Sequence, residues 1–177
     1  MTENQAISFL ACPYQFYETS TECWKEEVQT IINKIVDSYD QLSKSEKTYY
    51  QALKIISVHW SQLDRKLFES KSEYLLVSAK VIDQLLSLLV SEMGELPFFN
   101  NETKCLESIE SKVDEGVVLK KILLEVDEPL LITYWNIAEK YCYRTNGNSP
   151  NQFEVIDVLN AKRYVRFPTR VDKQLMS

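Results

Sequence analysis

The most distinctive chemistry in this sequence lies at its C-terminal end, where basic and aromatic residues are interleaved. Residues 162–177 contain five basic residues and one acidic residue, whereas the preceding 161 residues contain 15 basic and 25 acidic residues. Guanidinium groups beside aromatic rings suit bidentate contacts with carboxylates or phosphates, and stacking on planar groups. The residues that we expect to bind a partner are Arg163, Tyr164, Arg166, Phe167 and Arg170.

Three interpretations of this basic segment remain open. It can fold back on the acidic body of its own chain, dock on an acidic partner protein, or grip nucleic acid. The formal net charge of −6 argues against a general affinity for phosphate backbones. We therefore predict a non-catalytic protein-interaction module, such as an adaptor, an inhibitor or an immunity-type antagonist, that binds a protein partner through a helical face and the basic arm. The alternative is an accessory subunit of a nucleoprotein complex, with the arm on the nucleic acid.

A catalytic role would have to centre on His59, the one histidine of the chain and its one side chain with an ordinary pKa near neutral. In a helical hairpin closed near Ser70, His59 would come close to Asp83, and such a pair can act as an acid–base dyad. A lone histidine without a neighbouring nucleophile is more typical of a residue that hydrogen-bonds at a helix boundary. We expect no enzymatic activity; an enzyme or ligand carrier with a pocket near His59 is the second alternative.

The sequence predicts neither a cofactor nor a metal ion. Its three glycines are far apart and form no phosphate-binding loop, and four cysteines without a C-x-x-C pair cannot complete a common zinc site with one histidine. We expect reduced, mostly buried thiols and a cytoplasmic protein. The apolar stretch at residues 6–11 is too short for a signal-peptide core or a membrane span, so no membrane contact is expected.

The elements that carry these residues are predicted to be helices. Residues 14–93 contain no glycine and no proline, and helix-start signatures recur at Thr19 with Glu22, Ser43 with Glu46, and Ser70 with Glu73. They divide the region into three helices of about 22 residues, each roughly 33 Å long. Short joints force neighbouring helices to alternate in direction, so residues 19–93 are expected to form an antiparallel core behind an N-terminal arm at residues 1–18.

Apolar residues recur at helical spacing along these segments. The third helix has a seam at Leu75, Ala79, Ile82, Leu86, Leu89 and Met93, and the second has one at Leu53, Ile56, Trp60, Leu63 and Leu67. We interpret both seams as core-facing. Apolar area left over from such seams could form a homodimer.

The second half of the chain is predicted to contain shorter helices over residues 94–161. Their expected ranges are 102–114, 117–124, 129–143 and 150–161, the third opened by Pro129 and the fourth by Pro150 behind the cap Ser149. Polar and apolar residues then alternate around Pro168, which indicates an extended arm at residues 162–177. The predicted fold is thus a single all-α domain of 177 residues: an antiparallel helical bundle of three long N-terminal helices and three to four shorter C-terminal helices, with an extended C-terminal arm.

Overall fold

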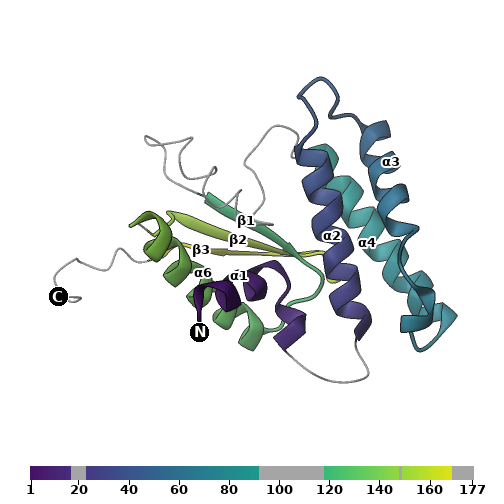
Figure 1. The fold of residues 1–177 in the computed structure, drawn as a ribbon. Helices are drawn as coiled ribbons and strands as arrows, with labels where there is room; N and C mark the ends of the chain where they lie inside the picture. The colour runs from purple at the N-terminus through teal and green to yellow at the C-terminus, as the bar shows by residue number, and fades with distance from the viewer. Residues whose placement is uncertain (17–22, 92–117, 148, 169–177) are drawn as a thin grey trace.

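The computed structural model describes residues 1–16, 23–91, 118–147 and 149–168 of the 177-residue chain. A three-helix unit lies on one side of a small β-sheet, and two further helices lie on the other side (Figure 1). The helices are α1 (Glu3–Ala11), α2 (Cys23–Asp40), α3 (Tyr49–Trp60), α4 (Lys71–Ser91) and α6 (Glu128–Asn146), and the strands are β1 (Val118–Leu123), β2 (Gln152–Asp157) and β3 (Lys162–Arg166).

The prediction of an all-α bundle is wrong, because a three-stranded mixed sheet of order β1-β2-β3 is present. β1 and β2 run parallel and are connected through α6, whereas β2 and β3 form an antiparallel hairpin. The strands β1 and β2 therefore lie within the segments predicted as helices at residues 117–124 and 150–161. The described residues contain five α-helices, not the predicted six to seven, and the helix predicted at residues 102–114 lies outside them.

Both faces of β1 are buried, which explains why its sequence does not alternate between apolar and polar residues. Leu119 and Leu123 pack into a core with α1 and α6, while Ile122 packs into a second core with α2, α3 and α4. In β2, Phe153 and Val155 pack into the first of these cores and Ile156 packs into the second. The sheet thus separates two hydrophobic cores.

The helices α2, α3 and α4 run in alternating directions along the right-hand side of Figure 1. Ser70 caps α4 by accepting a hydrogen bond from the Glu73 backbone N–H at 3.0 Å. The corresponding signature at Ser43 forms a turn, and α3 begins at Tyr49 behind the N-cap Thr48. The signature at Thr19 lies outside the described residues.

Of the residues predicted to form the core-facing seam of α4, Leu89 is the one that is buried in the described part of the helix. Its buried apolar side chains are Val77, Val81, Leu85, Leu88 and Leu89. Leu75, the first residue of the predicted seam, is 53% exposed. α4 therefore carries two apolar faces, and the sheet and the neighbouring helices cover one of them.

The helix α1 and a 3₁₀ turn at Pro13–Phe16 lie where an N-terminal arm was predicted. Thr2 and Gln5 form a capping box at the start of α1, and Phe9 and Leu10 are buried against α6. The Tyr134 hydroxyl donates a hydrogen bond to the Leu10 carbonyl at 2.8 Å. This contact fixes the C-terminal part of α1 to α6.

Candidate functional site

β3 places the predicted partner-binding residues along one edge of the sheet. Its residues alternate between the two faces, so that Tyr164 and Arg166 lie on the α6 side while Arg163 and Val165 lie on the opposite side. Arg170 lies outside the described residues. The predicted extended arm is therefore, over residues 162–166, an integral strand of the sheet.

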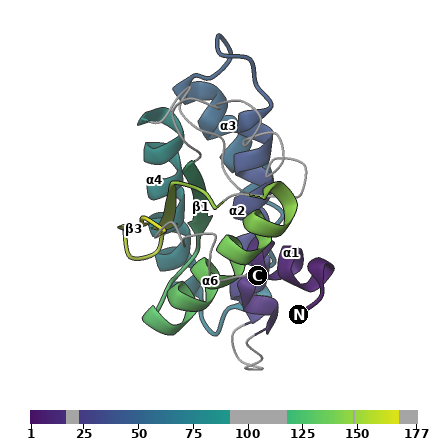
Figure 2. The ribbon, with the colours of Figure 1, turned by 90° about the vertical axis from the view of Figure 1, so that its left-hand side faces the viewer.

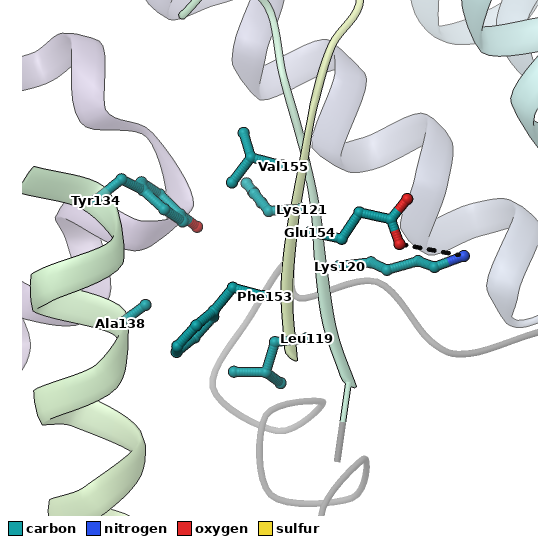
Figure 3. Close-up of a pocket in the computed structure, with 8 residues that line it drawn as sticks. All are labelled: Leu119, Lys120, Lys121, Tyr134, Ala138, Phe153, Glu154 and Val155. Carbon is teal, nitrogen blue, oxygen red and sulfur yellow. Dashed lines mark ion pairs between the residues drawn. The ribbon is translucent and has the colours of Figure 1, made fainter. Parts of the chain in front are cut away.

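Arg163 is tied to its own chain by an ion pair with Glu154 of β2. The Glu154 carboxylate is buried and also lies 3.9 Å from the Lys120 ammonium group of β1. Figure 3 shows Glu154 and Lys120 on the same side of the sheet, away from α6. This carboxylate neutralises two basic side chains where the three strands meet.

Arg166 packs against α6. Its guanidinium donates to the Asn136 side chain at 3.3 Å, lies 3.4 Å from the Glu139 carboxylate, and stacks 5.7 Å from the ring centroid of Trp135. Tyr164 packs partly buried against the same core. Both described arginines of the arm therefore contact acidic groups of their own chain, as the fold-back interpretation predicts.

Apolar side chains remain exposed beside these arginines. Val165 is 43% exposed and Phe167 is 70% exposed. Among the described residues, no strand or helix pairs with the outer edge of β3. An unpaired strand edge presents backbone N–H and C=O groups that a further strand can bind.

A side chain of α2 covers the C-terminal end of the opposite edge of the sheet. Gln29 is fully buried, and its side-chain amide donates to the Ile122 carbonyl at 3.0 Å and accepts from the Leu124 N–H at 2.8 Å. It thereby pairs with β1 as a neighbouring strand would. At this end of the β1 edge a buried side chain thus supplies the hydrogen bonds, whereas no described residue does so at the outer edge of β3.

A buried lysine lies beneath the junction of α1 and α2. The Lys121 ammonium group donates to the Ala11 carbonyl at 3.2 Å and to the Asn33 side-chain oxygen at 2.9 Å.

Burial lowers the pKa of Lys121 to about 7, against smaller opposing effects of Cys12 and Asp37. Burial raises the pKa of the Cys12 thiol to about 11, and Glu26 adds to this rise. The Lys-Lys pair at 120–121 inside an apolar run was the one sequence signal for these buried cations.

A small cavity lies between α6 and the sheet. Its lining includes Leu119, Tyr134, Ala138, Phe153 and Val155, which surround it in Figure 3. Its volume of about 10 Å³ corresponds to about one water molecule. A substrate or cofactor would not fit there without rearrangement.

His59 contacts α2 and not the carboxylate suggested by the sequence. Its Nε2 atom lies 2.9 Å from the Ser38 hydroxyl, and its Nδ1 atom is buried without a hydrogen-bond partner among the described residues. A half-buried histidine that contacts a hydroxyl of the neighbouring helix fits the helix-boundary interpretation.

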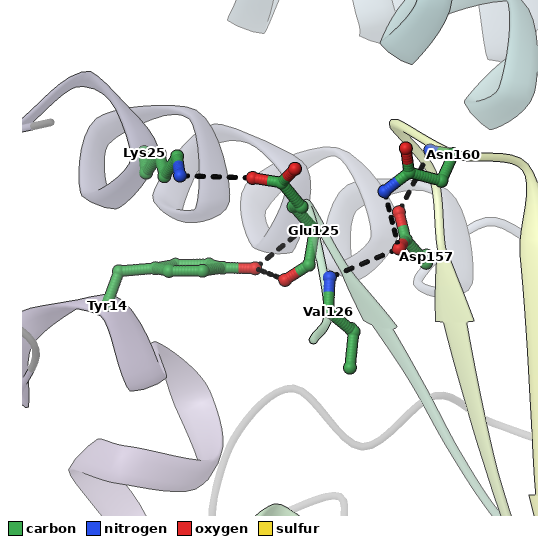
Figure 4. A network of polar contacts seen from close by, with 6 residues as sticks. All are labelled: Tyr14, Lys25, Glu125, Val126, Asp157 and Asn160. Carbon is green, nitrogen blue, oxygen red and sulfur yellow. Dashed lines mark hydrogen bonds and ion pairs between the residues drawn. The ribbon is translucent and has the colours of Figure 1, made fainter. Parts of the chain in front are cut away.

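A further buried carboxylate stabilises the β2–β3 turn. Asp157 is fully buried and accepts hydrogen bonds from the Val126 N–H at 3.1 Å and from both the backbone and the side chain of Asn160 at 2.9 Å (Figure 4). Nearby, the Tyr14 hydroxyl donates to the Glu125 carbonyl at 2.6 Å and accepts from its N–H at 2.9 Å. The Asp157 hydrogen bonds join the segment after β1 to the turn before β3. The Tyr14 hydrogen bonds join the segment after α1 to the same part of the chain.

Within residues 1–16, 23–91, 118–147 and 149–168, no cluster of metal-ligating side chains occurs. α4 is long and apolar enough to cross a membrane by length and composition alone, but one of its faces packs into the core of the three-helix unit.

Comparison of the chain with protein-family models, curated proteins and solved structures found no match.

Proposed function

We propose that this protein is a non-catalytic interaction module that binds an extended segment of a partner protein along the edge of β3. The open edge, flanked by the exposed side chains of Val165 and Phe167, is the observation that carries the proposal. A segment added as a fourth strand gains affinity from main-chain hydrogen bonds and specificity from alternate side chains. An adaptor, an inhibitor or an immunity-type antagonist would each use such a surface.

The ion pairs that the two described arginines of the arm form within the chain favour a protein partner over nucleic acid. Arg163 is paired with Glu154, and Arg166 with Glu139. Binding to phosphates would require both guanidinium groups to leave carboxylates, whereas strand addition leaves these ion pairs in place. The arginines then position β3, and the apolar side chains beside them contact the partner.

The surroundings of the titratable residues support a role without catalysis. His59 bonds Ser38, and Lys121 is enclosed by α1, α2 and the sheet. The cavity that Lys121 helps to line holds about one water molecule. A substrate would have to open the core to reach that amine.

Site-specific photo-crosslinking in native cell extract tests the proposal. A benzophenone amino acid replaces Phe167 in one sample and Val58, a residue of α3 that is 52% exposed, in the control. We expect a defined protein to be captured from position 167 and not from position 58. Excess unlabelled wild-type protein should compete for this capture, whereas the Val165→Glu variant should compete poorly.

Three results would count against the proposal. Equal capture at positions 167 and 58 would mean that the β3 edge has no specific partner. Equal competition by the wild type and the Val165→Glu variant would place the partner on another surface. Capture of RNA or DNA from position 167 would instead support the nucleoprotein alternative.

A further inference from the structure

The outer edge of β3 lies beside one flank of α6. Figure 2 shows β3 at the left-hand margin of the molecule and α6 toward the viewer. α6 returns the chain from β1 to the parallel strand β2, so it runs against β2, and β3 does the same. Figure 3 shows Ala138 of α6 level with Phe153, the β2 partner of Arg166. α6 and β3 therefore run in the same direction and are level at Ala138 and Arg166.

The flank of α6 next to β3 has exposed apolar side chains on both sides of Arg166. Asn136 and Glu139, which contact the Arg166 guanidinium, mark this flank. Ile132 and Tyr143 each lie four residues from one of them, and therefore on the same side of the helix. Both are 48% exposed.

The rise of a helix and of a strand places these two side chains at defined levels along β3. Ile132 lies about 9 Å before Ala138 along α6, and Tyr143 lies about 8 Å after it. A strand advances about 3.3 Å per residue, so these distances correspond to the levels of Tyr164 and Pro168. A strand added beside β3 would cover both apolar side chains with residues that face α6.

A hollow lies where β3 ends. It is lined by Ser149, Pro150, Asn151 and Pro168, and its volume is about 160 Å³. A cavity of about 150 Å³ holds a benzene molecule, so this hollow has room for one aromatic side chain, and its two prolines give it apolar walls. Pro168 has no backbone N–H, so regular pairing with β3 ends beside the hollow.

Arg166 supplies the polar centre of this surface. Its side chain is 33% exposed, and its contacts with Asn136 at 3.3 Å and Glu139 at 3.4 Å are long for a charged donor. A guanidinium group has five N–H donors in a planar fork that suits a carboxylate. Residues 162–168 contain three basic residues and no acidic one. An acidic side chain of a partner is therefore favoured here over a basic one.

On the basis of the function proposed above, we propose that the partner segment is five residues of extended chain: an acidic residue at the centre, apolar residues on both sides and an aromatic residue at one end. The acidic side chain contacts Arg166, its two neighbours cover Val165 and Phe167, and the aromatic ring fills the hollow at Pro168. The remaining apolar side chain covers Ile132. Successive side chains of a strand alternate between its faces, so the segment uses both faces. In a segment parallel to β3 the aromatic residue comes last, and in an antiparallel segment it comes first.

Selection of a displayed library of random peptides on the full-length protein tests this chemistry. We expect the enriched sequences to carry Asp or Glu between apolar residues, with Phe, Tyr or Trp two positions from the acid. Synthetic copies should compete with photo-capture of the partner from position 167.

Exchanged ion pairs test the acidic centre. The double variant Arg166→Glu with Glu139→Arg keeps an ion pair between β3 and α6 with its charges reversed, so it should select Lys or Arg at the centre of the peptide. The matched control is Lys25→Glu with Glu125→Lys, which reverses an ion pair of 3.0 Å between α2 and the segment after β1. This control should still select an acid.

Asn151→Trp tests the hollow, because it places a large side chain at an exposed position of the lining. Peptides enriched on the wild type should bind this variant at least about 10-fold more weakly. They should bind Ser57→Trp, at an exposed position of α3, as they bind the wild type.

The outcomes separate the chemistry of the partner from the proposed function. Peptides that compete with capture from position 167, yet keep an acid on the Arg166/Glu139 exchange or bind Asn151→Trp undiminished, would overturn the partner chemistry alone. A selection without a common pattern would do the same if a protein is still captured from position 167. Without that capture, the proposed function and the partner chemistry fail together.

Discussion

The burial of Lys121 makes the free energy of unfolding of this protein depend on pH. The ordinary lysine value of 10.5 falls to about 7 in the folded protein, because burial removes the ammonium group from water. Between pH 7 and 10.5 the unfolded chain therefore binds one more proton than the folded chain at this site. Stability rises with pH across that window by about 1.4 kcal/mol per pH unit, and below pH 7 this group adds no further dependence.

Two other buried groups limit the range in which this effect can be seen alone. The pKa of Cys12 rises from 9.0 to about 11, and burial also raises the pKa of Tyr14 above its ordinary value of 10.0. Both stay protonated in the folded protein while they ionise in the unfolded chain, so they lower stability as the pH rises above about 9. In the window from pH 7 to pH 9 the effect of Lys121 therefore dominates, with an expected gain of about 2 kcal/mol.

The perturbation is Lys121→Met, measured by urea unfolding followed through tryptophan fluorescence at half-unit pH steps. The variant should remain folded, because the Ala11 carbonyl still accepts a hydrogen bond from Asn33 at 2.9 Å and Asn33 accepts one from Gln29 at 3.0 Å. We expect its free energy of unfolding to lack the wild-type rise between pH 7 and 9. Lys54→Met, at an exposed position on α3, is the matched control and should keep the rise. Parallel pH profiles for the wild type and Lys121→Met would refute the reasoning.

Three further predictions concern buried polar contacts, each measured as a free energy of unfolding at pH 7. Gln29→Leu should cost about 2 to 4 kcal/mol, because it leaves the backbone edge of β1 buried without partners; a cost below 0.5 kcal/mol would mean that water replaces the amide. Asp157→Ala should cost about 2 to 4 kcal/mol, since three N–H donors lose their acceptor, while Asp83→Ala on the surface should change stability by less than about 0.5 kcal/mol. Tyr14→Phe should cost about 1 to 3 kcal/mol through the loss of two hydrogen bonds to the Glu125 backbone, and an unchanged value would show that those backbone groups find other partners.

Local signals predicted several elements well. The N-cap Ser70 and the apolar periodicity after it mark α4, and Pro129 lies in the first turn of α6 behind the N-cap Asp127. These signals depend on side chains within one or two turns of each other, so the sequence contains all the information that they require.

The two misassigned helices show what local signals lack. Residues 117–124 have apolar side chains at nearly every position, which suits a helix and a doubly buried strand equally well. Within that run Lys120 and Lys121 are buried, and their partners, Glu154 on β2 and Asn33 on α2, are distant in the chain. The helix-start pattern at Ser149 to Gln152 is followed by a strand, because parallel pairing with β1 outweighs the local preference.

The C-terminal segment divides in the same way between sequence and structure. Alternating residues around Pro168 predicted extended backbone and a cluster of basic and aromatic side chains. The register of β3 with β2 decides which of these side chains lie on each face of the sheet. It brings Arg163 to Glu154 and Arg166 to Glu139 of α6. Val165 and Phe167 are exposed. Of the predicted binding residues, Arg163 and Arg166 thus contact acidic groups of their own chain, whereas Phe167 is exposed beside Val165.

By itself the sequence determined that three successive helices lie between residues 23 and 91, that α6 has a capped start, that residues 162–166 are extended, and that an acidic body is followed by a basic end. Each of these follows from composition or from contacts between near neighbours in the chain. The tertiary structure alone decided that residues 118–123 and 152–157 are strands, that Lys121 and Asp157 are buried, and which apolar face of α4 packs into the core. Those outcomes depend on pairings across 30 or more residues, whose free energy no local pattern records.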